Sequence, residues 1–272
     1  TREEPERYDV SRFEPLEFYY ETVSFRGPRR LTDVQVNISI PFEHLILPED
    51  AGDTVVVNRG LSLMDNQYTR VSPAQQDIRV AISEPMWGRA VLDRVDLKAM
   101  PGEYKLAIQV GRWNTNRLQS YLQDLKIQDY SGNRLGLSDL FVAKAVSAAA
   151  EVESDPRFVR GRWSIVPMPS HVFEAGQHVF VYFEIYSLVR DEFGSTRYDV
   201  AYEVHGTGET GSVSPILTRI LGRTGAAVTV RYEQTGTEAS VSDYVELDIG
   251  EAAEGRYVVR MTVTDLISSQ EV

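Results

Sequence analysis

Residues His178 to Val204 read HVFVYFEIYSLVRDEFGSTRYDVAYEV, and this stretch decides the fold class. Its first part, Val179 to Ile185, is apolar or aromatic except for Glu184. Its last part, Arg197 to Val204, alternates in a way that is typical of a strand with one solvated face. The polar segment Val189 to Ser195 between them predicts a turn. We therefore expect a hairpin whose first strand is buried on both faces and whose second is half exposed, as in the centre of a β-sandwich.

The composition limits the classes of partner. Lys and Arg number 28 against 40 Asp and Glu, and the net charge of −12 argues against nucleic acid and against anionic membrane surfaces. Cysteine is absent, which excludes disulfides, thiolate-bound zinc and cysteine nucleophiles. With 272 residues, 42% of them hydrophobic, the chain is long enough for two packed domains.

The sequence also bears on location. No run approaches the roughly 20 apolar residues of a transmembrane helix, so we expect no membrane span. The first residues, Thr1 to Arg7, are charged and do not resemble a signal peptide, which fits either a cytosolic protein or a mature form. A cysteine-free β protein is typical of the bacterial envelope or of secretion. We expect an extracytoplasmic location, with the cytosol as the alternative.

Alternating segments recur along most of the chain and divide it into an arm at 1–14, a first β-sandwich at 15–136 and a second at 137–272. Residues 137–146 are ambiguous, because Ser138 could cap a helix that runs to Glu151; we favour a strand. Expected strands are 16–25, 31–40, 54–64 (with Gly60 as a candidate break), 68–71, 77–82, 90–97, 104–110, 118–127, 215–221, 227–232, 244–249 and 257–263, with edge pieces at 45–48 and 163–166.

An internal repeat supports two domains. The segment Val95 to Val110 can be laid over Leu247 to Val263, and in both a strand ends, a glycine turn follows and a tyrosine starts the next strand. We predict that Tyr104 and Tyr257 form tyrosine corners, in which the phenol bonds the preceding connection; the alternative is an ordinary tyrosine at a strand start. The predicted fold is all-β, with two tandem immunoglobulin-like or fibronectin-III-like sandwiches.

Several segments together resemble the β-rich C-terminal region of bacterial GWxTD-domain proteins. The family's SDL segment, PNPS turn and YFEIYNL strand have counterparts here, with Met168 and Ser187 in place of two asparagines. The naming motif is absent, since Trp87, Trp113 and Trp163 lie in other contexts. The resemblance implies an extracytoplasmic β-rich protein without established chemistry. The matching segments are DVQVNISIPFEHL (33–45), PGEYKL (101–106), LSDL (137–140), PMPSHVF (167–173) and VYFEIYSL (181–188).

No catalytic or metal-binding pattern stands out. Nucleophile elbows, Walker loops and dinucleotide fingerprints are absent, and none of the four histidines pairs at metal-ligand spacing. A weak calcium site is conceivable from the acidic residues near the central turn, but solvated acids are the more usual case. We expect no catalytic residue, no cofactor and no metal. The histidines are His44, His171, His178 and His205; the acids are Asp191, Glu192, Asp199 and Glu203.

Exposed aromatic residues could form a carbohydrate platform, although large aromatics in sandwiches are more often core. Trp87 and Trp113 lie next to turns, which makes them the candidate ligand-facing residues. Tyr19, Tyr20 and Tyr121 are further candidates.

The sequence therefore predicts a non-catalytic structural or protein-interaction module of a bacterial envelope or secreted assembly. It would act by rigid presentation of loops or by pairing through an exposed strand edge, with a protein partner or a second copy. Ser268 to Val272 look like the start of another strand, which a partner strand could complete, unless further sequence follows. The alternatives are a carbohydrate-binding module and an accessory domain of an envelope hydrolase.

Overall fold

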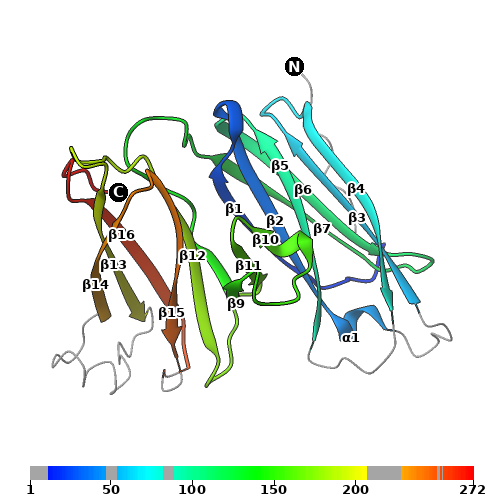
Figure 1. Ribbon diagram of the computed structural model, residues 1–272. Helices are drawn as coiled ribbons and strands as arrows, with labels where there is room; N and C mark the ends of the chain where they lie inside the picture. Colours follow the sequence, from blue (N-terminus) through cyan, green and yellow to red (C-terminus); the bar gives the residue numbers. More distant parts are fainter. Residues whose placement is uncertain (1–11, 47–53, 82–88, 207–227, 250–251, 253) are drawn as a thin grey trace. The chain divides into compact units, whose positions relative to one another are not determined.

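The computed structural model describes all residues except 1–11, 47–53, 82–88, 207–227, 250–251 and 253 (Figure 1). Within the described part, almost all regular structure is strand, and helical turns are confined to three short segments: Pro28–Arg30, α1 (Phe42–Leu45) and Pro156–Phe158. The all-β class predicted from the sequence is confirmed. The chain divides into two compact units, residues 1–131 with 167–170 and residues 132–166 with 171–272.

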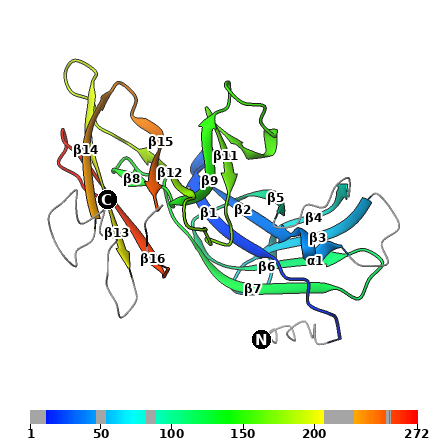
Figure 2. The ribbon, with the colours of Figure 1, turned by 90° about the horizontal axis from the view of Figure 1, so that it is seen from below.

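Unit 1 is a sandwich of two antiparallel sheets, ordered β1-β2-β5 and β4-β3-β6-β7 (Figures 1 and 2). Inward side chains of both sheets form one core; Val36 and Ile38 from one sheet and Leu106 and Ile108 from the other are fully buried. The core uses every second residue of each strand because side chains alternate between the faces. The strands are β1 (Tyr19–Arg26), β2 (Thr32–Pro41), β3 (Thr54–Met64), β4 (Arg70–Ala81), β5 (Ala90–Ala99), β6 (Gly102–Arg112) and β7 (Leu118–Ile127).

Unit 2 also has two sheets, ordered β10-β11-β9-β12-β15, with β8 beside β12, and β14-β13-β16. Its core joins Val181 and Phe183 of the first sheet to Val200 and Val263 of the second. The strands are β8 (Gly136–Leu137), β9 (Phe141–Ala148), β10 (Val159–Arg160), β11 (Trp163–Pro167), β12 (His178–Tyr186), β13 (Thr196–Gly206), β14 (Val228–Gly236), β15 (Ser240–Asp248) and β16 (Tyr257–Asp265).

The two units repeat one strand order. The order β1-β2-β5 in unit 1 corresponds to β9-β12-β15 in unit 2, and β4-β3-β6 corresponds to β14-β13-β16. In each unit the chain crosses between sheets after the second, fourth and fifth of these strands. This shared order agrees with the internal repeat in the sequence; the assignment to tandem immunoglobulin-like or fibronectin-III-like domains stays a prediction.

The predicted hairpin of residues 178–204 is wrong. β12 pairs with β9 and β15, whereas β13 pairs with β14 and β16 in the other sheet. Alternation along a strand specifies which face is buried, but it does not specify the partner strand. The predicted burial is confirmed for β12, which is buried on both faces. For β13 it is confirmed in part: Tyr198 and Val200 are buried and Arg197 is exposed, but Asp199 on the predicted solvent face is also buried.

Other segments refine the predictions. Gly60 does not interrupt β3, segments 68–71 and 77–82 belong largely to the single strand β4, and the piece at 45–48 begins with the end of helix α1. β11 lies between β9 and β10 and is not an edge strand. Residues 137–146 form strands, as favoured, and not a helix. The predicted strand at 215–221 lies outside the described residues.

The segment after β16 turns back along this strand. Val263 and Val272 exchange two backbone hydrogen bonds, with N–O distances of 2.8 and 3.0 Å. This pairing matches the expected start of a further strand. Among the described residues, no helix is long and apolar enough to cross a membrane.

Candidate interaction surface

Three connections of unit 2 lie at one end of the sandwich, and we call them the loop end: residues 187–195, 237–239 and 266–270. They follow β12, β14 and β16, which run in the same direction and finish together at the upper left of Figure 1. Binding residues are commonly carried on loops that a rigid scaffold of strands holds in place.

The tip of the first connection is a tight turn with a fixed backbone. One carboxylate oxygen of Asp191 accepts hydrogen bonds from the backbone N–H groups of Phe193 (2.9 Å) and Ser195 (2.8 Å). The backbone N–H of Asp191 donates to the carbonyl of Ser195 at 2.8 Å, and Gly194 adopts a φ of 81° that favours glycine. The turn leaves the side chain of Phe193 83% exposed, more than any other large apolar side chain in the described part of the chain.

The base of the loop end is organised by Asp265, which is fully buried at the end of β16. Its Oδ2 accepts the backbone N–H of Val189 at 2.8 Å, and its Oδ1 accepts those of Ile267 at 2.9 Å and Ser268 at 3.2 Å. Burial raises the pKa of this carboxyl, whereas the hydrogen bonds from the backbone donors lower it. Together the hydrogen bonds have the larger effect, and the net pKa lies below that of an ordinary aspartate. The carboxylate is therefore ionised at neutral pH and connects two of the three segments.

Two further hydrogen bonds join the third connection, residues 237–239, to the first. The Leu188 N–H donates to the Ala239 carbonyl at 2.9 Å, and the Arg190 Nε donates to the Thr237 carbonyl at 2.7 Å. All three segments are thus bonded to one another or to a common residue. A surface held in this way loses little conformational entropy when it binds.

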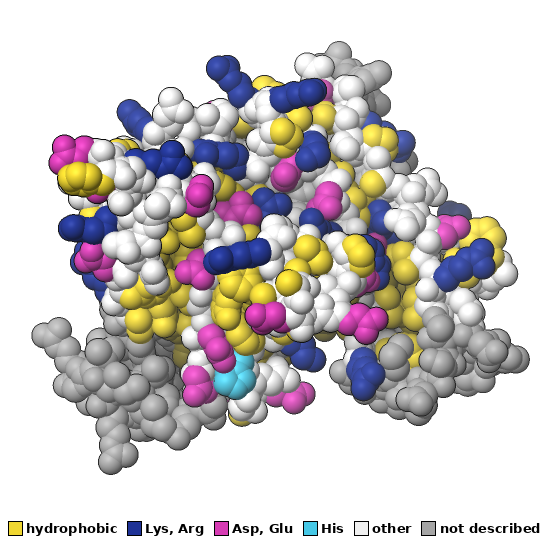
Figure 3. Space-filling model, in the orientation of Figure 1, with side chains coloured by type: hydrophobic (Ala, Val, Ile, Leu, Met, Phe, Trp, Pro, Cys, Tyr) yellow, Lys and Arg dark blue, Asp and Glu magenta, His cyan; other side chains and the backbone are white. Residues whose placement is uncertain are grey.

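The loop end exposes an apolar side chain and charged side chains, of which more are acidic than basic. Phe193 is flanked in sequence by exposed Glu192, and Glu238 on the neighbouring connection has a side chain that is 77% exposed. Arg190 forms an ion pair with Glu238 at 3.9 Å and is itself half exposed. Figure 3 shows acidic, basic and hydrophobic side chains next to one another at the upper left, over these loops.

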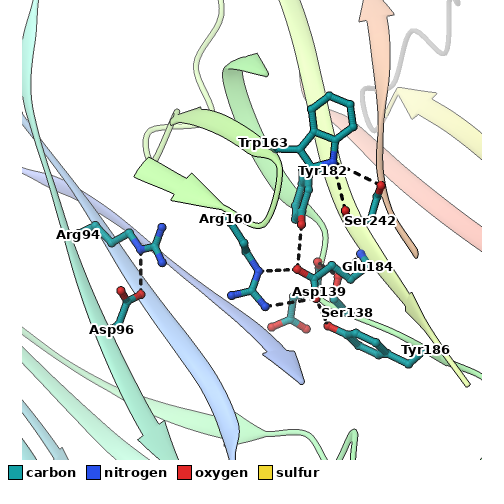
Figure 4. A network of polar contacts seen from close by, with 10 residues as sticks. All are labelled: Arg94, Asp96, Ser138, Asp139, Arg160, Trp163, Tyr182, Glu184, Tyr186 and Ser242. Atoms are coloured by element: carbon teal, nitrogen blue, oxygen red, sulfur yellow. Dashed lines mark hydrogen bonds and ion pairs between the residues drawn. The ribbon is translucent and has the colours of Figure 1, made fainter. Parts of the chain in front are cut away.

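A second polar cluster in unit 2 centres on Glu184 of β12 (Figure 4). Arg160 donates two hydrogen bonds to its carboxylate, from Nε at 2.5 Å and from Nη2 at 3.2 Å. The hydroxyls of Tyr182 and Tyr186 donate to the two carboxylate oxygens at 2.8 and 2.7 Å. Ser138 exchanges hydrogen bonds with the backbone of Glu184, both at 2.9 Å.

The Glu184 carboxylate has all of its close hydrogen-bond partners within the fold. Each oxygen of the Glu184 carboxylate already accepts two hydrogen bonds, and Glu184 and Arg160 are only 14% and 15% exposed. Burial lowers the pKa of Arg160 while the hydrogen bond and charge of Glu184 raise it, and the net pKa lies above the ordinary value. Burial, followed by the charge of Glu184, raises the pKa of Tyr182. The arrangement fixes the short strand β10 to the centre of the sheet.

The predicted tyrosine corners differ in what surrounds them. The Tyr104 hydroxyl donates to the Met100 carbonyl at 2.9 Å, across the connection from β5 to β6, which is the geometry of a tyrosine corner. Tyr257 begins β16 and is 36% exposed. Residues 250, 251 and 253 before it lie outside the described part, and its corner stays a prediction.

The structure describes four of the five candidate ligand-facing aromatics, and two of these four are partly buried. Trp113 is 59% exposed in the turn after β6, whereas Trp87 lies outside the described residues. Tyr20 and Tyr121 are partly buried and packed with Phe18, whose ring meets Tyr121 edge-on at an interplanar angle of 72°. Tyr19 is 44% exposed. A flat stacking surface for a sugar needs coplanar exposed rings, so carbohydrate binding stays a prediction without a described site.

Most of the acids and histidines considered for metal binding have other partners. Asp199 accepts two hydrogen bonds from Arg231, and Glu203 lies 3.0 Å from His205. Asp191 is used in its own turn. His44 lies 3.4 Å from Glu17, and His178 lies 2.6 Å from Glu246. His171 lies in the connection after β11 with a φ of 51°. Within the described ranges, no group of three or more acidic, histidine or cysteine side chains is placed to hold a metal ion.

Sequence reasoning located the turn that carries Phe193 but missed Asp265 and Arg160. Asp-x-x-Gly at Asp191 to Gly194 is a local turn signature, so this turn could be read directly. Asp265 binds a backbone group 76 residues away, and Arg160 binds Glu184 24 residues away. The local signal at Asp265 is the pair of serines, Ser268 and Ser269, that follows within the same turn.

Comparisons with known proteins identify no family for this chain. No family model matches it, and no curated protein matches it. A solved structure titled as a "putative beta-galactosidase" from Bacteroides fragilis is similar with a TM-score of 0.29 and 10% sequence identity. The match covers 40% of this chain and 16% of that chain, and similarity at this level carries no argument about activity.

Proposed function

We propose that this protein is a non-catalytic structural and protein-interaction module of a bacterial extracytoplasmic assembly, and that the loop end of unit 2 is its interaction surface. The carrying observation is the 83% exposure of Phe193 on a turn whose backbone is held by Asp191. Burying a phenylalanine contributes about 1.5–3 kcal/mol, which this side chain does not gain within its own fold.

The surrounding hydrogen bonds favour recognition over catalysis. Asp265 and Asp191 use their carboxylates to bond backbone N–H groups of the loops. Such bonds hold loops in place, and they leave neither carboxylate as a general acid or base at the tip. Rigid loops on a β-sandwich are a common means of binding another protein.

The extracytoplasmic location rests on two sequence features. The chain has no cysteine. Its segments also resemble the β-rich region of GWxTD-domain proteins, which implies an envelope or secreted setting. On the same basis we propose that this chain is the β-rich part of a GWxTD-domain protein, or of a relative that lacks the naming motif.

A capture experiment in separated cell fractions tests this function. The purified chain would be offered at equal concentration to envelope, culture-medium and cytosolic fractions of the source organism, and bound proteins would be quantified by mass spectrometry. We expect a stoichiometric protein partner from the envelope or medium, and it should bind again when both proteins are purified. Partners found only in the cytosolic fraction, or a chemical change of the captured partner on incubation, would contradict the proposal.

A further inference from the structure

The loop end has the anatomy of a binding hot spot. An aromatic anchor, Phe193, stands at the tip, and charged residues lie on the same two connections: Arg190, Asp191 and Glu192 before it in the chain, and Glu238, which pairs with Arg190 at 3.9 Å. Measured hot spots have this form, with a central aromatic that enters a pocket and a polar rim that excludes water. Because the turn is already fixed, insertion of Phe193 requires little ordering of its backbone.

The charge of the rim restricts what the anchor can enter. Asp191, Glu192 and Glu238 carry three negative charges, and Arg190 carries one positive charge, which leaves a net charge of −2 around the tip. An exposed phenylalanine could also insert into a lipid surface, but an acidic rim on a protein of net charge −12 is repelled by anionic lipids. A protein pocket with lysine or arginine at its margin satisfies both the apolar tip and the acidic rim.

We propose that Phe193 inserts into an apolar pocket of a protein partner, and that basic side chains around this pocket face Glu192 and Glu238. The inference rests on the proposed interaction function and names the chemistry of the partner. Phe193 supplies most of the affinity. The two glutamates supply orientation and the rate of association, because exposed charges act mainly on the encounter.

Photo-crosslinking from the tip tests the pocket directly. Phe193 would be replaced by p-benzoylphenylalanine, which keeps an aromatic side chain, and the intact chain would be irradiated in the envelope extract. A matched bait would carry the same residue in place of Val172, which is 65% exposed in the connection before β12. The bait at 193 should yield one dominant protein crosslink, mapped to apolar residues with lysine or arginine next to them, and the bait at 172 should not.

A second experiment tests the role of the two glutamates with the purified partner. The double substitution Glu192→Gln and Glu238→Gln should slow association several-fold at low salt and flatten its dependence on salt concentration, with little change in dissociation. Vesicles of phosphatidylglycerol and phosphatidylethanolamine serve as the lipid probe, and no binding to them is expected.

The outcomes separate the inference from the function on which it rests. A captured partner that crosslinks elsewhere and not from residue 193 would overturn the inference and leave the interaction function standing. Binding to vesicles that depends on Phe193 would also overturn it. A crosslink that maps to an acidic or fully polar surface would contradict the proposed pocket chemistry. Absence of a protein partner by every bait and in every fraction would contradict the interaction function itself.

Discussion

The buried carboxylate of Asp265 accepts the backbone N–H of Val189 at 2.8 Å, and this bond joins the end of β16 to the beginning of the loop that carries Phe193. The two residues are 76 positions apart in the chain. The position of the exposed tip therefore depends on a side chain in a different strand, and the loop end is a product of the whole sandwich rather than of one local turn.

Removing the charge of Asp265 should loosen the loop end. Asp265→Asn keeps the size of the side chain but replaces one acceptor oxygen by an amide nitrogen, so one or more of its three backbone bonds is lost. We expect a decrease of about 1–3 kcal/mol in the free energy of unfolding, typical of lost hydrogen bonds to a charged group. Amide hydrogen exchange at Val189, Ile267 and Ser268 should accelerate. The control Asp124→Asn, whose side chain is 87% exposed, should leave exchange at the loop end unchanged.

The same residue predicts a dependence on pH. The pKa of Asp265 is lower in the folded state than the ordinary value of about 3.9, so its stabilisation is complete above that pH. It is lost as the pH falls through the lower, folded pKa, because protonation then occurs in both states. The difference in unfolding free energy between the unmodified protein and Asp265→Asn should be largest near pH 7 and should shrink as the pH falls below the ordinary aspartate pKa of about 3.9. A difference that is constant across this range would show that the carboxylate charge is not the source.

The Glu184 cluster predicts a large effect from a single substitution. Arg160→Met leaves the Glu184 carboxylate in a mostly buried site without its cation, and should reduce the free energy of unfolding by about 3 kcal/mol. Adding Glu184→Gln should recover part of this loss, since the uncompensated charge is then removed. Arg157→Met is the matched control, because the Arg157–Asp155 pair is 40–50% exposed and should change stability by less than about 1 kcal/mol. Chemical denaturation of all four proteins measures these differences. If Arg160→Met costs no more than Arg157→Met, the cluster is not a stabilising feature.

The tyrosine corners can be compared within one chain. Tyr104→Phe removes the 2.9 Å hydrogen bond to the Met100 carbonyl and should cost about 1 kcal/mol of unfolding free energy. Tyr257→Phe should cost a similar amount if unit 2 has the same corner, as the sequence repeat predicts. Thermal unfolding of the two variants provides the comparison. A neutral Tyr257→Phe beside a destabilising Tyr104→Phe would limit the corner to unit 1.

The features that could be predicted from the sequence are those set by residues close to one another in the chain. The strands at 178–186 and 196–206 could be predicted because their hydrophobic pattern is local, and the turn at Asp191 could be predicted because its signature spans four residues. Tyr104 bonds a carbonyl four residues away and was also predictable.

The pairing of these strands could not be predicted in the same way. β12 binds β15, about sixty residues later in the chain, and nothing in the alternation of residues 178–204 distinguishes this pairing from a hairpin. Asp265 looked like one of 40 acids until the fold placed it beneath Val189. Phe193 read as a residue within a polar turn, and its exposure became meaningful only when the hydrogen bonds that hold it were known.

The most direct test of the central claim is the affinity of the purified partner for Phe193→Ala, measured by titration calorimetry beside Val172→Ala. Both substitutions remove exposed apolar surface from unit 2, but only Phe193 lies at the loop end. The account predicts that Phe193→Ala weakens binding about 10- to 100-fold, as expected for a hot-spot aromatic, while Val172→Ala leaves the affinity unchanged. Equal affinities of both variants and the unmodified protein would contradict the claim that Phe193 anchors the interaction.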